Sequence, residues 1–452
     1  MAAVSTREIV LEILLAVLEK DELGHLVLHQ ALDKYGYLEK QERGFLTRLS
    51  NGTISKVIEL DWMIDAFSSI PVRKMKPVIR NILRMTVYQL KYMDSVPVSA
   101  ACNEAVKLAE RKGFGTLKGF VNGVSRSIAR GMQQLSLPEG MSLSEQFSVQ
   151  YSMPKWLVEQ WLEEYGEELT RQMLQGFAVQ EESRETTVRC NLSLAGRDII
   201  IESLRQQQVT VREDDSLSCA LHISGYDRLE QLNAFVQGWI QVQDVSSMLV
   251  GLSAAPRRGS ICMDVCAAPG GKSLHLADLL AGTGMVYSYD VSLDKVYLIE
   301  ENGMRSGFPN LRTQVRDALV LEEEEKEKAD LLIADLPCSG LGIIGNKPDI
   351  KYKASPEKCR ELADLQRQIL GTVWQYVKPG GTLIYSTCTI CQEENRDNAN
   401  WFADSYPFDI MPLDGSAFGV EEAVTAEGYL QILPGREDMA GFFIARFRRR
   451  AN

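Results

Sequence analysis

The stretch that decides the fold runs Ile261-Cys-Met-Asp-Val265, then Cys266-Ala-Ala-Pro-Gly-Gly-Lys272, and continues into a helix expected over Ser273–Leu280. A short apolar strand, a loop of small residues and a helix are typical of a nucleotide-binding turn. Small residues let backbone amides approach a ligand, and the helix N-terminus favours negative groups. The loop has neither the Gly-x-Gly-x-x-Gly pattern of nicotinamide sites nor the Gly-x-x-x-x-Gly-Lys-Ser/Thr pattern of phosphate loops. A tight turn without a ligand would explain the glycines too. The neighbouring loops must therefore show whether this loop binds a ligand.

Strands and helices alternate through the rest of this half of the chain, from Gln237 to Asn452. This alternation predicts a mostly parallel sheet with helices on both faces, and a ligand beyond the carboxyl ends of the strands. Asp290 ends the strand after the glycine loop, where an acid can accept hydrogen bonds from both hydroxyls of a ribose. The expected strands are Ile261–Val265, Met285–Tyr289, Leu331–Ala334 and Leu383–Tyr385.

Two more loops at strand ends carry cysteines, Asp335-Leu-Pro-Cys338 and Ser386-Thr-Cys388-Thr-Ile-Cys391. Each cysteine alone fits a buried thiol as well as a reactive one, but two such loops of one sheet should face the same cleft. Cys388-x-x-Cys391 also has the spacing of a metal or redox pair. Zinc would need two further nearby ligands, and the chain has only 4 histidines. We therefore expect no metal, and a structural role for Cys391.

The first 130 residues show apolar positions at helical spacing, as at Val10, Ile13, Leu14 and Val17, and predict a compact helical domain. They hold 19 Lys and Arg against 14 Asp and Glu, whereas the whole chain has a net charge of −12. The stretch Arg111–Arg130 contains five basic residues and no acid. It fits a solvated helix face, and it also fits local phosphate binding, which an acidic chain average does not exclude.

The middle of the chain, residues 131–236, is less regular. Strands expected at Thr186–Asn191 and Ala220–Ser224, with a helix at Asp198–Gln206, indicate a small α+β module. A length of 452 residues exceeds one ordinary core and predicts two or three domains. No apolar run approaches the roughly 20 residues of a membrane span, and the first residues lack the layout of a secretory signal. The 9 scattered cysteines indicate reduced thiols, so we expect a cytoplasmic protein.

Three segments of the C-terminal half carry a family resemblance. Asp264–Lys272, Asp335–Gly342 and Ser386–Thr389 closely resemble the signature motifs of RNA 5-methylcytosine methyltransferases. The resemblance spans essentially all of Gln237–Phe447. Its paired Pro-Cys and Thr-Cys loops are specific, because DNA cytosine methyltransferases have one such cysteine.

The helical part resembles a second family, the RNA-binding antitermination factor NusB, in Pro77–Arg84, Asn103–Ala109 and Lys118–Val124. A NusB-like domain joined to this methyltransferase domain is the layout of the bacterial small-subunit (16S) rRNA cytosine-C5 methyltransferases of the Sun/Fmu type. The resemblance implies a multidomain fold of three parts. These are an all-α NusB-like RNA-binding domain (1–130), linker helices with the small α+β module (131–236), and a Rossmann-like α/β methyltransferase domain with a mostly parallel seven-stranded sheet (237–452).

The resemblance also implies a reaction, the transfer of a methyl group from S-adenosyl-L-methionine to carbon 5 of a specific cytosine in 16S rRNA. Carbon 5 is too weak a nucleophile to take a methyl group unaided, and a thiolate added to carbon 6 places electron density on it. By resemblance Cys388 forms this covalent adduct, Cys338 releases the product, and Asp335 contacts N3 and the exocyclic amine. The base must be single-stranded or flipped out of a helix. Transfer from a sulfonium calls for no metal.

The resemblance implies a binding site for S-adenosylmethionine as well. Asp290 would hold the ribose and Asp317 would lie near the adenine, although an acid at a strand end also fits a solvated turn. Lys272 would order the active site or contact the cofactor. The full set is Cys266, Ala267, Ala268, Pro269, Gly270, Gly271, Lys272, Asp290, Asp317 and Asp335.

Two alternative functions remain open. A tRNA cytosine-C5 methyltransferase is disfavoured only by the NusB-like domain, and a non-catalytic RNA-binding or antitermination factor is disfavoured by the intact cysteines and glycine loop. Asp335-Leu-Pro-Cys338 differs from the Asp/Asn-Pro-Pro-Tyr/Phe of enzymes that methylate adenine or exocyclic amines. We expect RNA as the partner, above all 16S rRNA, with no DNA and no membrane, and a monomer.

Overall fold

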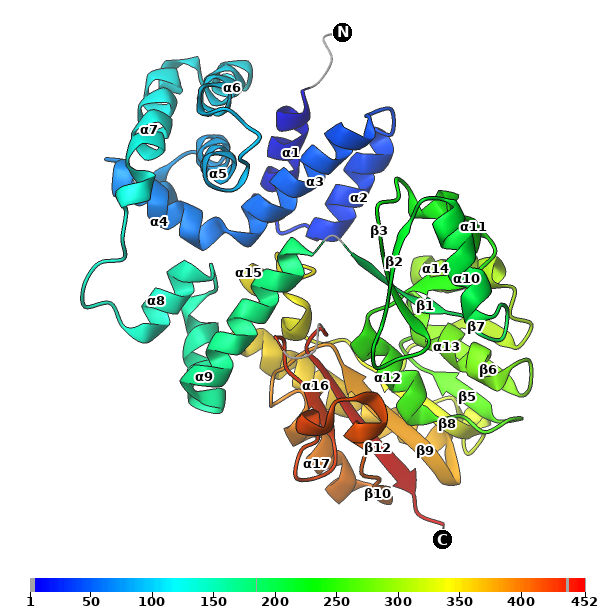
Figure 1. The fold of residues 1–452 in the computed structure, drawn as a ribbon. Coiled ribbons are helices and arrows are strands. Elements are labelled where there is room, and N and C mark those ends of the chain that lie inside the picture. The colour runs from blue at the N-terminus through cyan, green and yellow to red at the C-terminus, as the bar shows by residue number, and fades with distance from the viewer. Residues whose placement is uncertain (1–4, 184, 436–438, 452) are drawn as a thin grey trace. The chain divides into compact units, whose positions relative to one another are not determined.

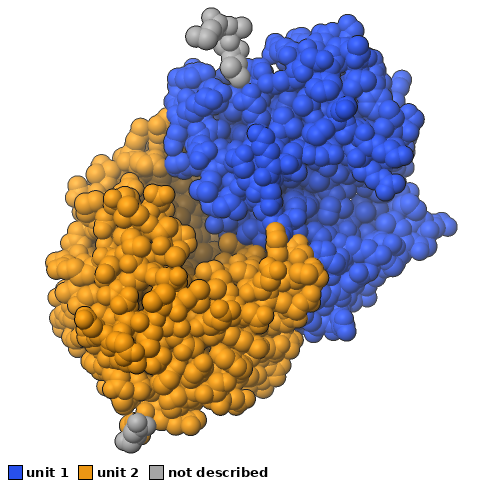
Figure 2. Space-filling view, turned by 180° about the vertical axis from the view of Figure 1, so that it is seen from behind, with its two compact units in different colours: residues 1–181, 344–353 blue, residues 182–343, 354–452 orange. Residues whose placement is uncertain are grey.

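The computed structural model describes residues 5–183, 185–435 and 439–451, and its ribbon is drawn in Figure 1. The chain forms two compact units, coloured blue and orange in Figure 2. Unit 1 consists of residues 1–181 and 344–353, and unit 2 of residues 182–343 and 354–452. In the part of the chain that is described, no helix is long and apolar enough to cross a membrane.

Unit 1 is all-helical, as its apolar periodicity predicted. Helix α1 begins after Ser5, whose side chain accepts a hydrogen bond from the backbone of Glu8, and its inner residues Val10 and Leu14 are fully buried. Pro77 opens α5, where a missing N–H costs little. The helices are α1 (Thr6–Glu19), α2 (Gly24–Lys34), α3 (Lys40–Ser55), α4 (Val57–Phe67), α5 (Pro77–Tyr92), α6 (Val98–Arg111), α7 (Lys118–Gly131), α8 (Leu143–Gln150), α9 (Lys155–Glu182) and α15 (Ile350–Lys353).

Unit 1 includes a segment, residues 344–353, that follows one of the cysteine loops in the sequence. Asp349 accepts a hydrogen bond from the backbone of Gly24 through Oδ2 (3.0 Å), at the start of α2. The buried Nζ of Lys351 donates to the backbone oxygen of Ser55 (2.7 Å), and burial lowers the pKa of this lysine to about 7. The sequence pattern gave no sign of these long-range contacts.

Unit 2 begins with a small antiparallel sheet in the order β2-β3-β1-β4. Apolar residues of its strands and of α10, such as Val188, Ile200, Leu204 and Leu221, form its core. The small α+β module expected in the middle of the chain is therefore confirmed. Its elements are β1 (Thr186–Cys190), α10 (Arg197–Gln206), β2 (Thr210–Glu213), β3 (Ala220–Ser224), α11 (Asn233–Val236) and β4 (Ile240–Val242).

The large sheet of unit 2 has the order β10-β12-β9-β8-β5-β6-β7. The five strands from β9 to β7 are parallel, and β12 and β10 complete the sheet antiparallel to their neighbours. This path has the seven strands expected, and the short β11 adds an eighth by pairing with β12. The strands are β5 (Ile261–Asp264), β6 (Met285–Asp290), β7 (Leu311–Val315), β8 (Ala329–Asp335), β9 (Val377–Thr387), β10 (Phe408–Ile410), β11 (Leu430–Ile432) and β12 (Phe442–Arg449).

Helices cover both faces of this sheet, so its central strands are apolar on both sides. In β8, Leu331 and Ile333 belong to the core on one face, whereas Leu332 and Ala334 belong to the core on the other. Residues of α12 and α13 line the first core, and residues of α16 and α17 line the second. These helices and their neighbour α14 are α12 (Val245–Ala254), α13 (Gly271–Leu280), α14 (Leu293–Ser306), α16 (Pro356–Val373) and α17 (Arg396–Ser405).

Gly342 connects the loops that follow β8 and β9. Its backbone N–H donates to the backbone oxygen of Cys388 (3.1 Å), and its own oxygen accepts from the N–H of Gly441 (2.8 Å). A Cβ at this position would lie 2.9 Å from the backbone oxygen of Cys388 and would also press on the backbone of Gly441. The close approach of three backbone segments therefore requires glycine here.

We expect Gly342→Ala to lower the free energy of unfolding by about 1–3 kcal/mol, because the added methyl group must displace backbone rather than a side chain. Urea unfolding of the full chain measures this change. Gly123→Ala in α7 is the matched control, because a Cβ there meets nothing within 4 Å and alanine favours a helix. A Gly342→Ala protein as stable as the wild type would contradict the prediction.

Candidate active site

The two cysteine loops of the large sheet meet at its carboxyl edge. Strands β8 and β9 pair in parallel with Asp335 opposite Ser386, so the loops that follow begin side by side. The sulfur atoms of Cys338 and Cys388 lie 3.4 Å apart, and both side chains are half-buried. The hydrogen bond to Cys388, together with burial, raises the pKa of Cys338 well above its usual range.

An ion pair lies beside the two sulfurs. Lys272 Nζ donates to Oδ2 of Asp335 (2.6 Å), and the hydroxyl of Ser386 donates to Oδ1 of the same carboxylate (2.7 Å). Burial acts to lower the pKa of Lys272, but the carboxylate of Asp335 outweighs it, and the charge of Cys388 adds to the net rise. A largely buried positive charge is therefore held close to the sulfur of Cys388.

A second acid, Asp264, is completely buried at the end of β5. The hydroxyl of Ser273 donates to its Oδ2 (2.7 Å). Burial is the main cause that raises the pKa of Asp264 to about 7, and the neighbouring charge of Asp335 adds to this effect. Burial likewise raises the pKa of Cys266, the first residue of the glycine loop.

The glycine loop lies between β5 and α13, as the sequence indicated. Gly270 has a φ of +103° at the start of α13, a conformation that favours glycine. The backbone N–H of Ala268 donates to Oδ2 of Asp290 (3.1 Å), and Lys295 Nζ lies 3.2 Å from Oδ1 of that acid. The structure thus brings Asp290 to the loop formed by Cys266, Ala267, Ala268, Pro269, Gly270, Gly271 and Lys272.

Asp317 lies one strand further along the same edge. The backbone N–H of the preceding residue, Arg316, donates to the backbone oxygen of Asp290 (2.9 Å). This hydrogen bond fixes the spacing between the two acids. Asp317 is exposed, and its Oδ1 accepts a hydrogen bond from the backbone of Leu319 (2.9 Å). Its side chain therefore caps a turn, which matches the solvated-turn interpretation, while the cofactor role expected for it stays a prediction.

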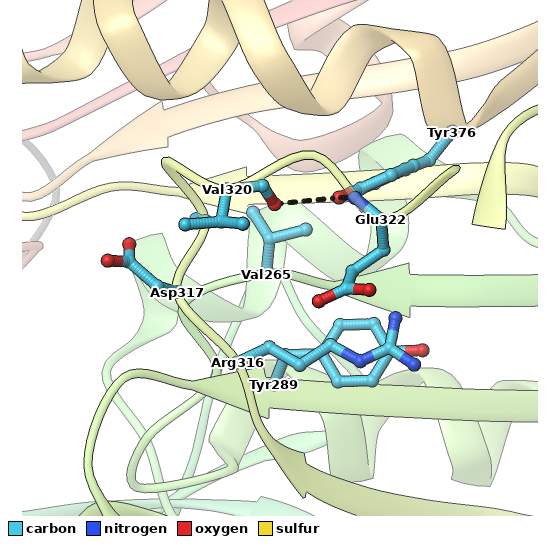
Figure 3. Close-up of a pocket in the computed structure, with 8 residues that line it drawn as sticks. Val265, Tyr289, Arg316, Asp317, Val320, Glu322 and Tyr376 are labelled. Carbon is cyan, nitrogen blue, oxygen red and sulfur yellow. Dashed lines mark hydrogen bonds between the residues drawn. The ribbon is translucent and has the colours of Figure 1, made fainter. Parts of the chain in front are cut away.

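Asp317 also lines a small pocket beside the ends of β5, β6 and β7 (Figure 3). The guanidinium of Arg316 lies over the ring of Tyr289, 4.3 Å from its centroid. On the opposite wall, the hydroxyl of Tyr376 donates to the backbone oxygen of Val320 (3.2 Å). An aromatic ring, a flat cation and an acid give this pocket the surfaces that a planar polar group requires.

Sequence reasoning missed Arg189 of β1, whose side chain contacts the end of the glycine loop. This side chain is 0% exposed, and its Nη1 donates to Oε1 of Gln243 (2.7 Å) and to the backbone oxygen of Gly271 (2.8 Å). Its Nη2 donates to Oδ1 of Asn191 (2.7 Å). The small α+β module therefore holds the start of α13 in place. The available signal was a basic residue between Val188 and Cys190 in an expected strand.

Sequence reasoning also missed Glu394, which is fully buried behind the Cys338 loop. Its Oε2 accepts hydrogen bonds from the backbone N–H of Ser339 (2.9 Å) and from Nε2 of Gln366 (2.9 Å). Glu394 thereby anchors the residue that directly follows Cys338. No local pattern in the sequence links these positions, which are 55 residues apart.

Three family models match successive parts of the chain. The model described as NusB family matches residues 4–130, and the ferredoxin-like domain of RsmF/B-like methyltransferases matches residues 153–227. The model described as 16S rRNA methyltransferase RsmB/F matches residues 252–448, which include every loop of the site.

Solved structures share the fold. The crystal structure of PH0851 is 26% identical, covers 98% of both chains and has a TM-score of 0.83. The structure of NSun6 from Pyrococcus horikoshii with SFG covers 66% of this chain and 99% of its own, at 20% identity and a TM-score of 0.58. The second likeness concerns the fold alone.

Curated relatives match the chain from end to end. "Probable ribosomal RNA small subunit methyltransferase B" of Bacillus subtilis (strain 168) is 34% identical over 100% of both chains. The protein of the same name from Synechocystis sp. is 31% identical over 99% of this chain and 100% of its own. With matching folds, matching domain order and relatives at this identity, the chain belongs to the ribosomal RNA small subunit methyltransferase B family.

Proposed function

We propose that the chain transfers a methyl group from S-adenosyl-L-methionine to carbon 5 of one cytosine in 16S rRNA, through a covalent bond between Cys388 and carbon 6. The observation that carries this proposal is the 3.4 Å approach of the Cys338 and Cys388 sulfurs at the carboxyl edge of the sheet. One cysteine would suffice for nucleophilic attack, and a second at this distance supports a separate role in product release.

The first step is the attack of Cys388 on carbon 6. The Cys388 thiolate is favoured by the hydrogen bond with Cys338 and by the charge of Lys272. When it adds to carbon 6, the electron pair of the double bond moves to carbon 5. Bound S-adenosylmethionine would supply the electrophilic methyl group that carbon 5 then takes. We assign to Asp335, which Lys272 and Ser386 hold by hydrogen bonds, the contact with N3 and the exocyclic amine of the cytosine.

Product release requires loss of the proton from carbon 5 and of the Cys388 sulfur from carbon 6. Cys338 is the group beside Cys388 that we assign to this step. To accept the carbon 5 proton, Cys338 must be a thiolate, and the hydrogen bond with Cys388 that keeps its pKa high is lost once Cys388 is bonded to carbon 6. Removal of the carbon 5 proton restores the double bond and expels the Cys388 thiolate.

The cofactor site is proposed for the glycine loop and its neighbours. Asp290 presents a carboxylate beside the backbone of Ala268, which suits the two hydroxyls of a ribose. Asp317 lines the pocket one strand away, beside the Arg316 guanidinium that covers the ring of Tyr289, and we assign the adenine to this side of the glycine loop. The residues present therefore fit S-adenosylmethionine, and the reaction as written involves no metal.

The substrate and the division of the chain are part of the same proposal. The names of the relatives favour 16S rRNA over tRNA. We assign RNA binding to residues 1–130 and catalysis to residues 237–452, and within residues 131–236 we assign support of the cofactor loop to the small α+β module that follows the linker helices. We further propose that the protein acts as a monomer in the cytoplasm, with no DNA or membrane partner.

The direct test is incubation of the purified protein with labelled S-adenosylmethionine and unmodified 16S rRNA, followed by mapping of 5-methylcytosine. We expect one modified cytosine, loss of at least 99% of the activity in Cys388→Ala, and accumulation of a protein–RNA adduct in Cys338→Ala, because release fails after attack. Cys102→Ala, which removes a buried thiol of α6, is the control and should keep its activity.

Each alternative function has its own outcome in this assay. Label in tRNA but not in 16S rRNA would keep the chemistry and contradict the substrate. Transfer by Cys388→Ala at the wild-type rate would contradict the assignment of the nucleophile. No transfer to any RNA, together with no binding of S-adenosylmethionine, would favour a non-catalytic RNA-binding factor.

The burial of Asp264 predicts a pH dependence of stability. Its pKa is about 7 in the folded protein and 3.8 in the reference state. Between these values the folded chain holds one more proton than the unfolded chain, so the free energy of unfolding falls as the pH rises from about 4 to about 7. We expect Asp264→Asn to remove this fall. The free energy of unfolding of the variant, relative to that of the wild type, should therefore increase by about 2 kcal/mol from pH 5 to pH 8.

Urea unfolding of both proteins at pH 5, 6, 7 and 8 checks this prediction. The control is Asp404→Asn, which changes an exposed aspartate of α17 and should follow the wild type at every pH. A constant difference in stability between Asp264→Asn and the wild type across this range would refute the effect of burial.

A further inference from the structure

A second cysteine pair lies behind the catalytic loops, outside the site described above. The sulfurs of Cys359 and Cys391 and a carboxylate oxygen of Glu394 all lie within 4.8 Å of one another. The three residues are 4%, 2% and 0% exposed. Although Cys391 is only three residues from Cys388, its partner is Cys359 of α16, which no sequence spacing indicated.

Glu394 has one oxygen that the protein leaves unsatisfied. Its Oε2 accepts two hydrogen bonds, from Ser339 and Gln366, and the thiol of Cys391 also interacts with the carboxylate, whereas the buried Oε1 accepts no hydrogen bond of regular geometry. A buried polar atom without a regular hydrogen bond is costly, and an ion at the site is one of the few explanations for it. The position of this carboxylate beside two thiols therefore points to a cation.

We propose that Cys359, Cys391 and Glu394 form a binding site for a thiophilic divalent cation of the Zn²⁺ class. Two sulfurs and one carboxylate oxygen are ligands that zinc accepts. The hydroxyl of Ser339, which hydrogen-bonds to Cys359, is a candidate for the fourth ligand. Tetrahedral zinc ligands stand about 3.3–3.8 Å apart at usual bond lengths. Small side-chain adjustments bring atoms already within 4.8 Å to that spacing.

The cation would link three parts of unit 2 that otherwise meet through hydrogen bonds. Cys359 belongs to α16, and Cys391 and Glu394 belong to the turn between the Cys388 loop and α17. Glu394 in turn holds the backbone of Ser339, which follows Cys338. The site would therefore stabilise the loops that carry Cys338 and Cys388 without contacting the substrate. Binding releases the thiol protons to solvent and involves no redox change.

Cobalt(II) is the probe, because cobalt bound to thiolates shows sulfur-to-cobalt charge-transfer absorption. We expect the full-length protein, treated with chelator and reducing agent, to develop this absorption with one equivalent of Co²⁺ and to lose it when Zn²⁺ is added. The Cys338→Ala/Cys388→Ala double variant should keep the absorption, whereas Cys359→Ser should lose it. Glu394→Gln should weaken cobalt binding at least tenfold.

A measurement on the wild type alone guards against a variant that fails to fold. One equivalent of Zn²⁺ should raise the unfolding temperature of the wild type, because a ligand that binds only the folded state stabilises it. An unchanged unfolding temperature would overturn the proposal and leave the cluster as packed thiols. Loss of the cobalt absorption in the Cys338→Ala/Cys388→Ala variant, with retention in Cys359→Ser, would also overturn it, by placing the cation at the catalytic pair.

Discussion

The parallel pairing of β8 with β9, which sets Asp335 opposite Ser386, is the constraint on which the site depends. Because neighbouring strands of a parallel sheet end at the same edge, the two loops that follow β8 and β9 begin side by side in this register. Cys338 and Cys388 then follow their strand ends at similar distances, and their sulfurs meet at 3.4 Å. A slip of one residue would turn the side chains of one strand to the opposite face and separate the pair. Gly342 adds a backbone hydrogen bond that holds the loops together after the strands end.

The charges of the site follow from this arrangement. Asp335 is held by Lys272 on one side and by Ser386 on the other, so its orientation is fixed before any substrate arrives. Removing one partner of a buried ion pair leaves an uncompensated charge, which is costly. Lys272 and Asp335 therefore depend on each other. Burial acts to lower the pKa of Lys272, and Asp335, Asp264 and Cys388 raise it in that order. The buried amine thus lies among three groups that can carry a negative charge.

Much of the fold could be predicted because its signals are local. Helical periodicity identified α1 and α5, and short apolar runs identified β5, β6 and β8. The loops at the carboxyl ends of strands could be placed on one edge from topology alone, which brought Cys338, Cys388 and Asp335 into one site before any geometry was known. The resemblance to RNA cytosine methyltransferases added the roles of these residues, and those roles stay predictions.

The remaining features depend on contacts between distant residues. Cys391 pairs with Cys359 across 32 positions, although its nearest cysteine in the sequence is Cys388. Arg189 reaches Gly271 from another sheet, because its long side chain can satisfy several acceptors while remaining buried. The segment 344–353 joins the helical unit through backbone and side-chain hydrogen bonds that no periodicity encodes. In each case the signal lies in three-dimensional proximity, which a single sequence does not contain.

The central claim is that the two cysteines have different roles and that Cys388 is the nucleophile. The most direct measurement is to incubate the wild-type protein with S-adenosylmethionine and 16S rRNA in which cytidine is replaced by 5-fluorocytidine, and to map the adduct by mass spectrometry. Fluorine at carbon 5 cannot leave as a proton would, so the covalent adduct persists after methyl transfer. The account predicts a nucleotide attached to the peptide that contains Cys388. A nucleotide attached to Cys338, or methyl transfer to ordinary rRNA with no adduct on the fluorinated RNA, would contradict it.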